Sequence, residues 1–166
     1  MTEAAERRAA EEAAQAEDTY RLRVTDELLS LLVQASDDGG FSIAITLQAG
    51  GFLVSGVLID QATYLRGQAE LVRAAGTEPD SGREEFARVF ERLAEEQERR
   101  SARRVARLRD ERAALEPEDI IRPAYIHLRD ARLIGAGVRT EMPYWRGRLD
   151  HVDAFWFGAL TAGATS

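Results

Sequence analysis

The chain has 166 residues, a net charge of −7 and no cysteine, and 27 of its residues are alanine. This length suits one domain, so we expect a single α+β domain over residues 19–166, preceded by an Ala/Glu-rich leader, residues 1–18, that is frayed or disordered. The lack of cysteine, of an apolar signal region and of a spanning segment favours a cytoplasmic protein with no membrane partner. The acidic balance argues against a broad nucleic-acid-binding surface.

A helix followed by a β-hairpin is predicted in the first third of the chain. Apolar residues recur at helical spacing after Thr19, and the pattern stops at Asp37-Asp38-Gly39-Gly40, where glycine can adopt the left-handed conformation that ends a helix. Strict alternation then predicts a strand from Phe41, a turn at Gly50-Gly51 and a return strand over Phe52–Ile59. Gly56 inside that strand predicts a bend or the close approach of another element.

A long helical insertion is expected over residues 61–116. Its first helix covers Gln61–Ala75, and its second runs from Arg83 to about Leu115, before Pro117. The stretch Ala94–Arg104 has no apolar residue larger than alanine, so we expect it to be solvated or paired with charge. Three Glu–Arg pairs lie four residues apart in the favourable order: Glu84–Arg88, Glu95–Arg99 and Glu96–Arg100.

The last third returns to β character. Three strands are predicted, over residues 124–134, 144–149 and 152–160, and Met142-Pro143 belongs to the separation between the first two. Together with the hairpin they make an antiparallel five-stranded sheet, or a small barrel of the Sm or SH3 type, with an N-terminal helix and the helical insertion.

The usual enzyme motifs are missing, so we expect no enzymatic activity, no catalytic residues and no cofactor. His127 lies on a predicted strand and His151 near a turn, and both are interpreted as surface or structural residues. Asp150, His151 and Asp153 carry metal-ligand chemistry, but alternation along a strand sends neighbours to opposite faces. We therefore expect no metal site.

Interaction surfaces are the more promising feature of this sequence. The second insertion helix is acidic up to residue 98 and basic from residue 99. This pattern is typical of a solvated helix whose charges oppose its own dipole. It is equally typical of a docking surface, either for an acidic partner or for a second, antiparallel copy of the helix. A homo-oligomer is therefore expected. The candidate interaction residues are Trp145, Arg146, Arg148, Phe155, Trp156, Phe157, Arg99, Arg100, Arg103 and Arg104.

Two blocks of residues resemble a known family. The hairpin GFSIAITLQAGGFLVSGVLI, residues 40–59, resembles that of the gas vesicle accessory protein U family (GvpU-like). YIHLRDARL and YWRGRLDHVDAFWFGAL, residues 125–133 and 144–160, resemble the family's C-terminal block, in the same order and at similar spacing. The strongest matches are Trp145-Arg146-Gly147, Val152-Asp153 and Phe157-Gly158. The leader and the more charged insertion depart from the family pattern.

The resemblance implies a non-enzymatic cytoplasmic protein associated with gas vesicles, acting in vesicle assembly, shell interaction or clustering through protein–protein contacts. Its implied partners are the gas vesicle shell protein and other accessory proteins. The alternative is an Sm-like nucleic-acid-binding module that uses Arg146, Arg148 and the arginines of residues 99–112.

Overall fold

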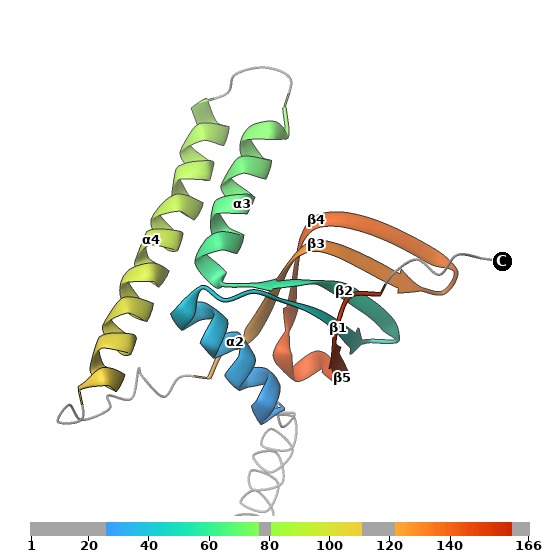
Figure 1. Cartoon of the computed structure of the whole chain (residues 1–166). Coiled ribbons are helices and arrows are strands. Elements are labelled where there is room, and N and C mark those ends of the chain that lie inside the picture. The colour runs from blue at the N-terminus through green and yellow to red at the C-terminus, as the bar shows by residue number, and fades with distance from the viewer. Residues whose placement is uncertain (1–25, 77–80, 111–121, 161–166) are drawn as a thin grey trace, which may run out of the picture.

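The computed structural model describes residues 26–76, 81–110 and 122–160. These residues form an α+β fold in which helices accompany one antiparallel sheet (Figure 1). Residues 1–25, 77–80, 111–121 and 161–166 lie outside the described part, and with them the leader, the predicted start of the first helix and the predicted end of the insertion. In chain order the elements are α2 (Glu27–Gly39), β1 (Ile43–Ala49), β2 (Phe52–Ile59), α3 (Gln61–Ala74), α4 (Ser81–Arg109), β3 (Tyr125–Gly135), β4 (Val138–Arg148), the 3-10 helix η2 (Leu149–His151) and β5 (Val152–Phe157).

The five strands are arranged in the order β4-β3-β2-β1-β5, and every neighbouring pair is antiparallel. The chain passes from one edge strand, β4, to the other, β5, through only the three residues of η2. In a flat sheet those edges would be about 19 Å apart, whereas four Cα steps reach at most about 14 Å. The sheet is therefore strongly curled at this end.

The curled sheet does not close, so the expected antiparallel sheet is confirmed and the alternative of a closed barrel is wrong. The physical reason lies in the strand lengths. β3 and β4 pair from end to end as one long ribbon, with one pair skipped at Asp130 and Pro143, whereas β5 has only six residues and pairs only with β1. Twist carries the long ribbon away from the short strand before a ladder can form between the two edges.

The main core lies between α2 and one face of the sheet. Leu29 and Val33 project from α2 onto Ile45, Leu58 and other residues that alternate along the strands. α2 begins at an N-cap where the Asp26 side chain accepts a hydrogen bond from the backbone N–H of Leu29 at 3.0 Å. It ends at Gly40, whose φ of 61° is the left-handed C-cap expected from the sequence.

The helical insertion is an antiparallel pair, α3 and α4, that lie side by side and project beyond the sheet (Figure 1). Ala94 is fully buried against Ala62 and Leu65 of α3, and Ala87 is fully buried as well. The stretch Ala94–Arg104, expected to be solvated or paired with charge, does carry ion pairs, but Ala94 itself is buried because small side chains let two helices pack closely. Within the described residues α4 ends at Arg109, earlier than predicted, and the Asp110 carboxylate that follows is unfavourable at a helix C-terminus.

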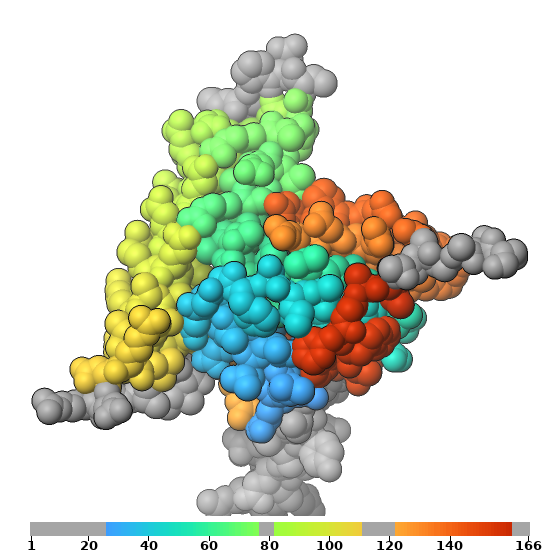
Figure 2. Space-filling view, in the orientation of Figure 1, coloured from blue at the N-terminus to red at the C-terminus, as the bar shows by residue number. Residues whose placement is uncertain are grey.

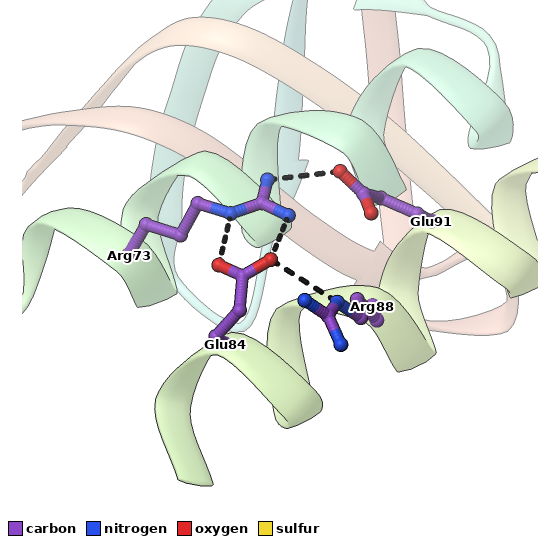
Figure 3. Close-up of polar contacts among 4 residues, drawn as sticks. All are labelled: Arg73, Glu84, Arg88 and Glu91. Carbon is purple, nitrogen blue, oxygen red and sulfur yellow. Dashed lines mark hydrogen bonds and ion pairs between the residues drawn. The ribbon is translucent and has the colours of Figure 1, made fainter. Parts of the chain in front are cut away.

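Ion pairs line the outside of this helix pair. Arg73 of α3 contacts Glu84 and Glu91 of α4, each at 2.9 Å, and Arg88 adds a further bond to Glu84 (Figure 3). The Arg73 guanidinium lowers the pKa of Glu84. All three pairs predicted four residues apart within α4 are present, at 3.3, 3.7 and 2.5 Å. Such exposed pairs contribute little to stability individually.

Two features of the strands depend on special residues. Gly56 lies where the register between β2 and β3 shifts, and a Cβ there would be 2.9 Å from the Arg129 carbonyl oxygen, which confirms the predicted close approach. The sequence suggested that Pro143 separates two strands. This prediction is wrong, because Pro143 lies inside β4. It is tolerated because β4 is an edge strand and the β3–β4 ladder skips one pair at Pro143, opposite Asp130, whose φ is 51°.

Candidate interaction surfaces

The four aromatic candidates near the C-terminus divide into two kinds. Trp145 and Phe155 are half-buried and pack against the main core. The Trp145 ring covers Gly147, where a Cβ would be 2.0 Å from the ring, so a larger residue at this position would displace the ring. Trp156 and Phe157 of β5 are 39% and 54% exposed, and β5 lies on the face visible in Figure 2 (red). Only the second pair is available to a partner.

Hydrogen bonds fix the strand that carries Trp156 and Phe157 to the rest of the sheet. Thr46 donates a hydrogen bond to the Gly158 carbonyl oxygen at 2.8 Å, and the backbone N–H of Leu160 donates to Ser55 Oγ at 2.8 Å. Thr46 and Ser55 are buried and bonded to each other at 3.0 Å. The chain after β5 is therefore tied across the outer face of β1 and β2, which holds β5 in place at the sheet edge.

The four α4 arginines also have different environments. Arg99 and Arg100 are exposed and pair with glutamates on the same helix. Arg103 is exposed and has no carboxylate partner among the described residues. Arg104 is mostly buried and forms an ion pair with Asp38 at the end of α2, beside a hydrogen bond from Ser101 to the same carboxylate. Arg104 therefore joins α4 to α2.

The two β4 arginines also have different partners. Arg148 forms an ion pair with Asp150 at 2.5 Å, which lowers the pKa of Asp150. Arg146 lies over the Tyr125 ring, with its guanidinium carbon 3.7 Å from the ring centre, which is a cation–π contact. No carboxylate of the described residues pairs with Arg146, whose positive charge contributes to lowering the pKa of His127.

The tertiary structure brings the two arginine groups together around one cleft of about 720 Å³. The end of α2, the start of α3, the basic half of α4 and the β3–β4 edge all contribute to its walls. We call it the arginine cleft. Its arginines are Arg100, Arg103, Arg104, Arg107, Arg122 and Arg146, and the acidic residues that line it among the described residues are Asp37 and Glu96. In a chain of net charge −7 this is a pronounced local excess of positive charge.

Asp37 forms part of the cleft wall and is unusual for a carboxylate. Burial raises its pKa to about 6, and the nearby charges of Asp60 and Asp38 act in the same direction. A hydrogen bond of 2.8 Å from the backbone N–H of Gln61, together with the charge of Arg104, opposes this shift. The sequence marked Asp37 only as part of a helix end, and its burial became visible only in the packed structure.

The two histidines have different surroundings. His127 is buried beside Tyr64, with ring centres 4.6 Å apart, and its Nδ1 atom has no hydrogen-bond partner in the described part of the chain. Burial lowers its pKa to about 4, so it is neutral at pH 7. His151 is exposed, and its Nε2 is 3.9 Å from Asp150. No group of three His, Cys, Asp or Glu in residues 26–76, 81–110 and 122–160 is arranged to hold a metal.

The described helices include none that is both long and apolar enough to cross a membrane. The described residues thus form an α+β unit with a curled open sheet and a helical insertion. A family model described as "Gas vesicle protein GvpU-like" matches residues 26–160, so the chain belongs to this family, a gas vesicle accessory family. No curated protein and no solved structure matches it.

Proposed function

We propose that this protein acts without enzymatic chemistry in the assembly, shell contacts or clustering of gas vesicles, through protein–protein contacts. The observation that carries the proposal is the family match, because it covers the sheet, α2 and the described part of the insertion. Its partners are the shell protein and other accessory proteins, and its location is the cytoplasm at the vesicle surface. The Sm-like nucleic-acid-binding alternative has no support from the open sheet or from the comparisons.

Two surfaces are suited to these contacts. The exposed rings of Trp156 and Phe157 offer apolar area on an edge strand, where aromatic residues commonly anchor an interface. Arg99, Arg100 and Arg103 offer an exposed basic stretch on α4, which complements an acidic partner. Trp145, Phe155 and Arg104 support the fold that presents these surfaces.

Flotation with isolated gas vesicles tests the proposal. The purified protein should enter the buoyant layer when vesicles are present and stay in the lower fraction without them. The double variant Trp156→Ala/Phe157→Ala should lose most of this flotation with little change in melting temperature, because both rings are largely exposed.

Trp145→Ala is the matched control for loss of an aromatic ring. It should lower the free energy of unfolding by about 2–4 kcal/mol, because the ring packs against the core. Flotation that is equal for the wild type and the double variant would exclude the β5 aromatic pair as the contact. A protein that never floats with vesicles would contradict the proposed vesicle association itself.

A further inference from the structure

The arginine cleft has the features of a ligand site that the proposed function does not require. Its volume of about 720 Å³ lies in the range typical of small-molecule sites. Its walls come from five separate stretches of the sequence, so the cleft exists only in the folded chain. A surface meant for a partner helix would be expected to form a long groove with apolar anchors.

The lining chemistry selects for negative charge. No Leu, Ile, Val, Met, Phe or Trp of the described residues lines the cleft, so an occupant gains little from the hydrophobic effect. Arginine presents a planar fork of N–H donors that matches carboxylate and phosphate oxygens in pairs. Arg103 and Arg146, which reach the cleft from α4 and β4, have no carboxylate partner among the described residues.

The number of positive groups favours an occupant with several negative charges. Within the cleft Glu96 neutralises Arg100, and the neighbouring Asp38 neutralises Arg104. The donors of Arg103 and Arg146 are left to face a ligand from two different walls, and a compact polyanion can contact both. Tyr125, whose ring lies under the Arg146 guanidinium, also lines the cleft.

We propose that the arginine cleft binds a small compound with a chain of phosphoryl groups, either an inorganic polyphosphate or a nucleoside polyphosphate. Arg103 of α4 and Arg146 of β4 hold the phosphoryl oxygens through charge-assisted hydrogen bonds. The ionised Asp37 carboxylate opposes the anion from a third wall. Arg103 therefore belongs both to this cleft and to the exposed basic stretch of α4 that is proposed above as a contact surface.

Calorimetric titration of the full chain with tripolyphosphate, ATP and adenosine tests this proposal. Tripolyphosphate and ATP should bind with 1:1 stoichiometry, and adenosine should not bind. Equal affinities for tripolyphosphate and ATP would assign recognition to the phosphate chain alone. Tighter binding of ATP would add contacts to the nucleoside, and both outcomes support the site.

Single substitutions distinguish binding in the cleft from general attraction of anions to the arginines of α4. Arg103→Ala and Arg146→Ala should each weaken tripolyphosphate binding by roughly tenfold or more, since each removes charge-assisted hydrogen bonds. Arg99→Ala is the matched control, because it removes the same charge from α4 outside the cleft, and it should change affinity less than about twofold. Asp37→Asn should tighten binding at pH 8. Melting curves without ligand check that each variant is folded.

Three results would overturn the proposal. The first is no saturable 1:1 binding of either polyphosphate at low salt. The second is an equal loss for Arg99→Ala and Arg103→Ala, which would indicate diffuse attraction of anions. The third is tighter binding of an oligoglutamate peptide than of tripolyphosphate, which would assign the cleft to an acidic protein segment.

Discussion

At the scale of single residues, Asp37 and His127 affect the pH dependence of stability in opposite directions. The pKa of Asp37 is raised from 3.8 to about 6, so between these values the folded state keeps a proton that the unfolded chain has lost, and stability falls as pH rises. The pKa of His127 is lowered from 6.5 to about 4, so over that window the unfolded chain holds the extra proton, and stability rises with pH. The two contributions largely cancel in the wild type.

Single substitutions should separate the two contributions. Relative to the wild type, Asp37→Asn should gain stability as pH rises from about 4 to 7, by up to about 3 kcal/mol, because the amide avoids the cost of a buried carboxylate. His127→Gln should gain relative stability in the opposite direction, as pH falls from about 6.5 to 4. Thermal unfolding followed by circular dichroism over a pH series measures both. Unfolding curves for Asp37→Asn that parallel those of the wild type at every pH would contradict the burial of this carboxylate.

At the scale of elements, the pairing of β2 with β3 depends on Gly56. A Cβ at this position would be 2.9 Å from a backbone oxygen of β3, and backbone cannot move aside cheaply. Gly56→Ala should therefore lower the free energy of unfolding by about 1–3 kcal/mol. The control is Gly39→Ala in α2, where nothing lies within 4 Å of the added Cβ, and stability should rise by up to about 1 kcal/mol. Chemical denaturation measures both, and equal effects would show that β2 and β3 are not closely packed there.

The α3–α4 pair depends on small residues at its interface. Ala94→Leu should destabilise the protein by about 1–3 kcal/mol, because Ala94 is fully buried and the helices have no space for a larger side chain. Ala106→Leu places the same side chain at an exposed position of α4 and should change stability by less than about 0.5 kcal/mol. Thermal melting compares the two variants. A tolerated Ala94→Leu would mean that the helix pair is loosely packed.

At the scale of the whole molecule, the exposed charge of α4 predicts weak, salt-sensitive self-association. Glu84, Glu91 and Glu98 already pair with α3 arginines inside the chain, so the basic half of α4 is the surface left for an acidic face of a second copy. Association should weaken from about 0.05 to 0.5 M salt, because exposed charges are screened beyond about 10 Å at 0.1 M. The triple variant Arg99→Glu/Arg100→Glu/Arg103→Glu should abolish it.

Sedimentation velocity at several protein concentrations measures this association. Arg104 is left unchanged in the triple variant, because its buried ion pair with Asp38 joins α4 to α2 and its loss would disturb the fold. If the wild type and the variant form the same oligomer at every salt concentration, α4 does not mediate the association, and the sheet edges are the surface to test next.

Much of the fold was predictable because its signals are local. The bounds of β2 match the prediction, α2 ends at the predicted glycine pair, and the three Glu–Arg pairs of α4 form as their spacing indicated. Periodicity, capping and turn chemistry act over a few residues, so they can be interpreted without knowing the rest of the chain. The resemblance to the family also rested on short blocks of this kind, residues 40–59, 125–133 and 144–160.

The tertiary structure alone decided the features that join distant segments. No spacing rule indicated that Ala94 is buried, that Arg104 is structural while Arg103 is open, or that Pro143 lies in an edge strand. The arginine cleft likewise depends on α4 placing its basic half beside the end of α2 and the β3–β4 edge. The sequence determined the local elements because their hydrogen bonds and caps are short-range. Burial, pKa shifts and the assembly of the cleft depend instead on contacts between distant segments. Such contacts join residues up to about 110 positions apart, as Thr46 and Gly158 show.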